Sequence, residues 1–153
     1  MTLTERLLAT AVLTGSGVVA GVLFAVALST VPALAAMPPG RYVQAHTLLG
    51  RNWDPTMPVI VLTSTLLNVL LAVLVPGAAR ALTIAAAVAL LGVSVVSHFG
   101  NVPINRRVHR TDPDRIPAGW ADPRPVWRRW HLVRTGLALS ALVADGLAVT
   151  LIG

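Results

Sequence analysis

The segment HFGNVPIN, residues 98–105, combines one imidazole with two carboxamides. In a helix, His98, Asn101 and Asn105 recur at intervals of three and four residues, so they share a face. An imidazole can take up a proton near neutral pH, and an amide N–H can stabilise an oxyanion. These residues are therefore candidates for a site at the polar end of the helix.

The segment WRRWHLVR, residues 127–134, has the same helical spacing and adds aromatic and guanidinium groups. Trp127 and His131 are four residues apart, and Arg134 lies three residues after His131, so these side chains can point together. Trp rings can wall a planar aromatic ligand, and a guanidinium can hold an oxygen anion. The two segments are therefore expected to converge at one end of the bundle and to form one candidate site, which consists of His98, Asn101, Asn105, Trp127, Trp130, His131 and Arg134.

Three other interpretations use overlapping residues. Asn, His, Trp and Arg near helix ends also serve as caps, interface anchors and snorkelling charges. A copper, zinc or iron site is a second alternative, although no close His-x-His or His-x3-His pair supports it; its ligands would be His46, His98, His109 and His131. A non-enzymatic membrane subunit that binds lipid phosphate through Arg106, Arg107 and Arg134 is the third. A deep slot walled by Trp favours an enzyme, and a shallow arginine-lined surface favours lipid binding.

The composition is that of a membrane protein. Hydrophobic residues make up 55% of the 153 residues and charged residues only 12%, which is too apolar for an ordinary soluble domain. The chain has no Cys, so disulfides and thiolate metal sites are excluded. The net charge of +6 comes from arginines at the ends of apolar segments, where membrane topology places them, and does not indicate nucleic-acid binding.

We predict an all-α fold, a single domain of residues 1–153 that forms a four-transmembrane-helix bundle in the lipid bilayer, with a homo-oligomer as one possible assembly. The predicted spans are residues 7–34, 57–76, 81–99 and 132–152. Asp145 is the acid within these spans. Because it lies about 21 Å along the helix from His131, we expect a structural contact toward the opposite end of the bundle.

The loops alternate between short and long. The first long loop should contain a short interfacial helix, Gly40 to Leu49, ended by Gly50 and followed by a turn at Asp54-Pro55. From this helix, Gln44 and His46 would close the substrate pocket. The second long loop, between spans three and four, is rich in proline and should be irregular and polar, with Pro125 at the start of the next helix.

Arginines set the predicted orientation in the membrane. The two long loops lie on one side and carry most of the arginines, whereas Arg6 and Arg80 lie on the other side. The positive-inside rule therefore places the long loops in the cytoplasm and both termini outside the cell membrane.

Four blocks resemble the DUF1772 family of anthrone oxygenase-like membrane proteins. They are Gly21-Val-Leu-Phe-Ala25, Val31-Pro-Ala-Leu34, Asn101-Val-Pro-Ile-Asn105, and Trp127-x-x-Trp130 followed by Arg134-Thr135. The resemblance covers almost the whole chain, and the second pair of blocks is the more specific. Phe24 belongs to the first of these blocks, and the resemblance therefore adds Phe24 to the candidate substrate-binding residues.

The resemblance implies a four-helix integral membrane protein and, for some members, a monooxygenase of polyketide biosynthesis. Such enzymes oxidise a planar anthrone to a quinone with O2, through a substrate enolate and without flavin, haem or metal. For that reaction, the resemblance implies His131 or His98 as the base, Asn101, Asn105 and Arg134 as groups that hold oxygen, and Trp127 and Trp130 as pocket walls. Many members have no known activity, so the resemblance leaves the substrate open.

Overall fold

The computed structural model describes residues 2–152 and contains four long helical segments and no strand within that range. The elements are α1 (Leu3–Ala25), the π-helical turn η1 (Val26–Thr30), α2 (Val31–Ala36), α3 (Pro39–Leu74), α4 (Gly77–Val96), the π-helical turn η2 (Ser97–Asn101), α5 (Val102–His109) and α6 (Arg124–Ile152). The first segment joins α1, η1 and α2, and the third joins α4, η2 and α5. The predicted spans fall within these segments, except that the second was extended to 76, beyond the end of α3 at Leu74.

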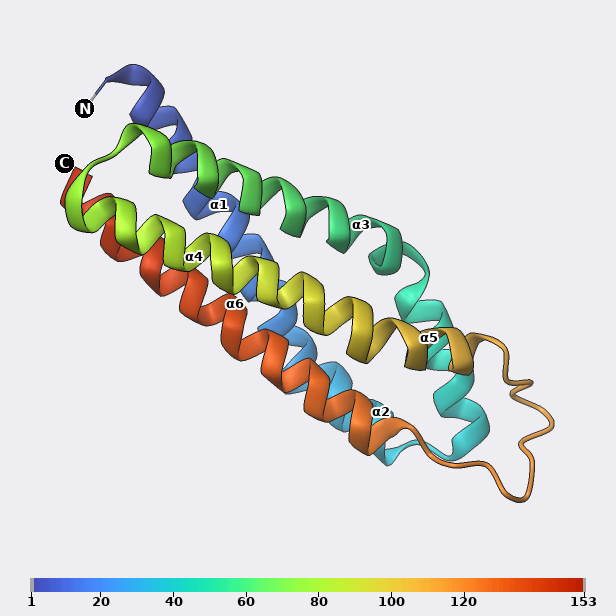
Figure 1. Ribbon diagram of the computed structural model, residues 1–153. Helices are drawn as coiled ribbons and strands as arrows, with labels where there is room; N and C mark the ends of the chain where they lie inside the picture. The colour runs from blue at the N-terminus through green and yellow to red at the C-terminus, as the bar shows by residue number, and fades with distance from the viewer. Residues whose placement is uncertain (1, 153) are drawn as a thin grey trace.

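The segments lie side by side as an up-and-down bundle (Figure 1). Both ends of the described chain and the short turn between α3 and α4 lie at one end of the bundle. At the other end lie α2, the first turns of α3, α5, and the residues 110–123 that connect α5 to α6 without a helix. We call this second end the loop end.

The outer surface of the bundle is apolar and the interior holds polar groups. Leu62, Val88 and Val143 are more than half exposed, whereas Asn68 and Asp145 are completely buried. Such a surface is unusual in water but suits lipid. Each of the four segments is long and apolar enough to cross a bilayer, and the protein is therefore a multi-pass membrane protein.

The helices are longer than the predicted spans because they extend beyond the hydrocarbon layer. A segment of 36 residues has a length of about 54 Å, whereas the hydrocarbon core is about 30 Å thick. The additional turns at the loop end pack into their own apolar cluster, which includes Leu34, Tyr42, Val108 and Trp127. This cluster fixes the positions of α2, α3, α5 and α6 relative to one another around the site described below.

The predicted boundary between an interfacial helix and the second span is wrong. Instead of ending at Gly50, the helix continues through Pro55 and Pro58 as part of α3. Residues 51–56 are exposed, so the backbone carbonyls that lose a partner to each proline can be solvated. The helix changes direction in this region rather than ending (Figure 1).

Two π-helical turns allow the other prolines to lie within continuous helical segments. η1 precedes Val31-Pro32 and η2 precedes Val102-Pro103, so each proline lies in the first turn of the next helix. A proline lacks the N–H that an α-helix needs in its interior, and the wider turn before it accommodates this loss. The third segment therefore continues past Pro103 to His109, and α6 begins at Arg124, one residue before the predicted Pro125.

Candidate functional site

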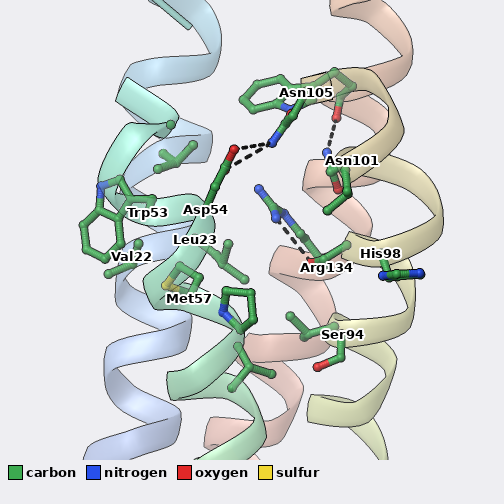
Figure 2. A pocket seen from close by; sticks show the side chains of 18 of the residues that line it. Val22, Leu23, Trp53, Asp54, Met57, Ser94, His98, Asn101, Asn105 and Arg134 are labelled. Carbon is green, nitrogen blue, oxygen red and sulfur yellow. Dashed lines mark hydrogen bonds between the residues drawn. The ribbon is translucent and has the colours of Figure 1, made fainter. Parts of the chain in front are cut away.

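A cavity of about 820 Å³ lies among the four helical segments, toward the loop end (Figure 2). Leu23 of α1, Met57 and Val61 of α3, and Val93 of α4 contribute apolar wall. This volume is in the range of pockets that bind small molecules. The polar and aromatic residues that line it include His46, Trp53, Asp54, Ser97, His98, Asn101, Asn105, His109, Trp127 and Arg134.

Arg134 of α6 places a guanidinium in the wall of this cavity (Figure 2). Its Nε and Nη2 donate to Nδ1 of His131 at 3.2 and 2.9 Å, and its Nη1 donates to Oγ of Ser97 at 3.3 Å. A guanidinium has five N–H groups, so these three contacts leave one N–H on Nη1 and one on Nη2. Within residues 2–152, no carboxylate forms an ion pair with Arg134.

His131 lies behind Arg134 and is fully buried. Its Nε2 is 3.0 Å from the carbonyl oxygen of Leu23. Because a carbonyl can only accept, Nε2 carries the proton, and Nδ1 is free to accept from Arg134. The ring of Trp127 stacks on the imidazole, with centroids 5.4 Å apart and an interplanar angle of 15°. Both ring nitrogens of His131 are therefore engaged, and the ring is separate from the cavity lining.

A second chain of polar contacts in the cavity wall connects three helices. The indole N–H of Trp127 donates to Oδ1 of Asn105 at 3.1 Å. Nδ2 of Asn105 then donates to Oδ1 and Oδ2 of Asp54 at 3.2 and 3.5 Å (Figure 2). Asp54 was not among the residues predicted for the site, because Asp54-Pro55 was interpreted as a turn. Its carboxylate lies in the cavity lining.

Asn101 is 1% exposed and lies in the cavity wall. Its Nδ2 donates to the carbonyl oxygen of Trp127 at 3.3 Å. Its Oδ1 is buried without a hydrogen-bond partner. A buried carbonyl oxygen without a partner is costly, and a hydroxyl group of a ligand in the cavity is one donor that can satisfy it.

The histidines other than His131 line the cavity at different places. His46 is buried, and its ring contacts Trp127 edge-on, with centroids 5.3 Å apart. His109 lies beside it, 6.1 Å between ring centroids. His98 is exposed on η2, and its ring points away from Arg134 (Figure 2). Among residues 2–152, no group of three or more His, Asp or Glu side chains is arranged to hold a metal ion.

Three residues predicted to bind substrate lie outside the cavity lining. Trp130 is 42% exposed on the outer surface and covers Gly100, where an added Cβ would come within 2.7 Å of the indole. Gln44 and Phe24 are exposed on α3 and α1. The structure thus brings together six of the predicted residues in the cavity wall: His46, His98, Asn101, Asn105, Trp127 and Arg134.

The loop end is tied together by Arg124, the first residue of α6. Its Nη1 donates to the carbonyl oxygens of Leu34, Ala35 and Met37, at the end of α2. Its Nε and Nη2 contact the carboxylate of Asp122 in the connecting loop. The hydrogen bond from Arg124 lowers the pKa of Asp122 below its ordinary value.

A separate polar cluster surrounds Asp145, away from the cavity. Oγ of Ser16 donates to Oδ2 of Asp145 at 2.5 Å, and Nδ2 of Asn68 approaches the same oxygen at 3.5 Å. Nδ2 of Asn68 also donates to the carbonyl oxygen of Ser64. These contacts join α1, α3 and α6, while Oδ1 of Asp145 and Oδ1 of Asn68 are buried without a hydrogen-bond partner. A structural role for Asp145 stays a prediction.

Comparison with known proteins identifies the family of the chain. No curated protein and no solved structure matches the chain. The family model described as "Anthrone oxygenase" matches residues 45–144. This range includes the cavity residues His46, Asp54, Asn101, Asn105, Trp127 and Arg134. The matched range covers more than half of the chain, and the protein therefore belongs to the anthrone oxygenase family.

Proposed function

We propose that this protein is a membrane-embedded monooxygenase that converts a planar anthrone-type substrate to a quinone with O2. One observation supports this function most strongly. The guanidinium of Arg134 lies in the wall of a large cavity, where two of its N–H groups have no partner and no carboxylate from residues 2–152 pairs with it. A desolvated cation is expensive in a membrane protein, and a bound oxyanion would offset that cost.

The reaction places three demands on the protein. An anthrone carries an acidic benzylic CH2 conjugated to a ketone, and loss of one proton gives an enolate. The enolate can transfer an electron to O2, and recombination gives a peroxide that loses water to form the new carbonyl. The protein must therefore supply a base, donors to the enolate oxygen, and apolar walls.

The cavity residues suit the second and third demands. The free N–H groups of Arg134 would hold the enolate oxygen, and the unpaired Oδ1 of Asn101 would accept a hydrogen bond from a phenolic hydroxyl of the substrate. Trp53 and Trp127 would contribute flat wall. The proposed role of His131 changes from base to support for Arg134, because both of its ring nitrogens are already engaged.

The substrate would enter from the lipid. Leu62, Val95 and Phe99 line the cavity and are also exposed on the outer surface of the bundle. They belong to α3, α4 and η2, so the cavity reaches the exterior between neighbouring helices. An apolar polycyclic compound dissolved in the bilayer would reach Arg134 without crossing water.

The test is oxygen uptake by the purified protein in detergent with emodin anthrone, with elemental analysis of the same sample. Enzyme-dependent oxygen uptake and quinone formation without stoichiometric metal would support a cofactor-independent oxygenase. Uptake that depends on about one bound metal equivalent would instead support the metal-dependent alternative through histidine. Absence of uptake with a panel of anthrones would overturn the proposed function.

We also propose that the protein lies in the cell membrane with its long loops in the cytoplasm and both termini outside. Because the chain has no Cys, a single Cys placed at Asp114 in the second long loop gives a clean probe. In intact cells this Cys should resist a membrane-impermeant thiol reagent and should react after permeabilisation. Labelling in intact cells would instead indicate the opposite orientation, with the long loops outside.

A further inference from the structure

The cavity contains one carboxylate, and its position relative to Arg134 points to a role in proton transfer. The chain has six acidic residues, and among them Asp54 alone contributes to the described cavity lining. Figure 2 shows Asp54 on α3 and Arg134 on α6 extending toward the same space from opposite sides. Among residues 2–152 no ion pair joins them, and both line the same cavity.

The orientation of the Asp54 carboxylate is fixed through Asn105. The indole N–H of Trp127 can only donate, so the atom of Asn105 that it contacts must be the carbonyl oxygen Oδ1. The amide nitrogen of Asn105 must then face Asp54, as observed. The ring of Trp127 itself contacts the rings of His46 and His131. A chain of aromatic and amide contacts thus holds the carboxylate in one position.

We propose that Asp54 is the general base of the reaction and that Asn105 is its positioning residue. This inference rests on the proposed function. In the first step the Asp54 carboxylate takes a proton from the benzylic CH2. The C–H electron pair moves into the ring system, and the resulting enolate oxygen is held by Arg134. The base and the oxyanion donors therefore act from opposite walls on the two ends of one conjugated system.

The same carboxylate completes the later steps. The enolate gives one electron to O2, and the two radicals combine to form a C–O bond and a peroxide anion, which takes the proton back from Asp54. Asp54 then removes the second proton from the same carbon. The C–H electron pair forms the new C=O bond, the O–O bond breaks, and the hydroxide that leaves takes up the proton as water. Overall, the CH2 group and O2 become a carbonyl group and one water molecule.

Two of the competing bases are less well placed in the structure. His131 has no free ring nitrogen, and His98 points away from Arg134 (Figure 2). His46 and His109 line the cavity, and Nδ1 of His46 is buried without a hydrogen-bond partner, so His46 is the competing base that the variants below must test. Asp54 combines free carboxylate lone pairs, a fixed orientation and a position opposite the anion-holding group.

The experiment isolates proton abstraction from oxygen chemistry. Emodin anthrone deuterated at its benzylic carbon is incubated anaerobically with the full-length protein in detergent, and loss of deuterium is followed by mass spectrometry against a protein-free blank. Wild type should accelerate the exchange. Asp54→Asn, which is isosteric and keeps the contact with Asn105, should lower both this acceleration and aerobic kcat by at least about 100-fold.

Matched variants separate catalysis from folding. Asp114→Asn, a change in the exposed connecting loop, should leave exchange and oxidation unchanged. Asp54→Ala should regain part of its activity when formate is added, because formate can enter the vacated space. Asn105→Leu should lower kcat while KM stays near the wild-type value. Each variant is accepted only if it elutes as a monodisperse species and unfolds at a temperature close to that of wild type.

The outcomes distinguish this inference from the proposed function. Wild-type protein that neither exchanges nor oxidises any anthrone would overturn the proposed function. Wild-type activity together with undiminished exchange in Asp54→Asn would overturn the role of Asp54 alone, and His46→Gln would then identify the base. Loss of exchange in Asp54→Asn with rescue of Asp54→Ala by formate would establish Asp54 as the base.

Discussion

Replacing Arg134 with methionine should abolish most of the activity while leaving the bundle folded. Methionine has a similar length and keeps the apolar contacts of the side chain but offers no donor and no charge. In wild type, three N–H groups of Arg134 contact His131 and Ser97, which leaves two for the enolate oxygen. Arg134→Met removes both of these donors from the substrate.

The expected magnitude follows from the number of donors lost. Removal of one donor to a developing oxyanion lowers kcat by about 10² to 10³, or about 3–4 kcal/mol of transition-state stabilisation. Because Arg134→Met removes two donors and a positive charge together, we expect kcat to fall by at least ~10³-fold. KM should change less than kcat, because negative charge on the substrate oxygen develops mainly in the transition state. Arg134→Lys, which keeps the charge but lacks the planar fork, should be intermediate.

The folding consequence is separate and smaller. Loss of the guanidinium leaves Nδ1 of His131 without a donor in the protein interior, which should cost about 1–3 kcal/mol of unfolding free energy. The assay is initial-rate oxygen consumption with emodin anthrone, combined with thermal unfolding of the same preparation. Arg128→Met, a change at an exposed arginine on the same helix, is the matched control and should retain activity. Folded Arg134→Met with wild-type kcat would refute the assignment of Arg134 as the anion-holding group.

Two further predictions concern stability. Gly100→Ala should reduce the free energy of unfolding by about 1–3 kcal/mol, because the new Cβ would overlap the indole of Trp130. Gly136→Ala is the control, because its Cβ would meet no neighbour within 4 Å and should leave the unfolding temperature unchanged. Equal unfolding temperatures for the two variants would argue against this packing. Asp122 has a pKa lowered by its hydrogen bond from Arg124, so its contribution to stability is present above the unfolded-state pKa and is lost as pH falls through the lowered folded-state pKa. Asp122→Asn should therefore remove a part of the acid destabilisation seen in thermal unfolding below about pH 4, and an unchanged acid profile would show that this contact does not contribute.

The sequence allowed the number of spans and much of the cavity lining to be predicted because both depend on local patterns. Long apolar runs identify membrane helices whatever their partners. The intervals between Asn101, Asn105, Trp127 and Arg134 place them at the loop end of two helices, and these helices pack together in the structure.

Other features depend on tertiary structure and were not evident from spacing. His131 and Arg134 share a helix face, but which of the two reaches the cavity depends on Leu23 of α1, whose carbonyl holds the imidazole behind the guanidinium. Asp54 precedes a proline, and that pairing favours a turn in a short window. Only the packing of α3 against α5 reveals that the helix continues and brings Asp54 to Asn105.

The most direct test of the central claim is the source of the new carbonyl oxygen. Purified wild-type protein is given emodin anthrone under ¹⁸O2 in unlabelled water, and the quinone is analysed by mass spectrometry together with the amount of O2 consumed. We predict one ¹⁸O atom in the quinone and one O2 consumed per quinone formed. A quinone without label, or one formed at the rate of the protein-free blank, would contradict an oxygenase function for this protein.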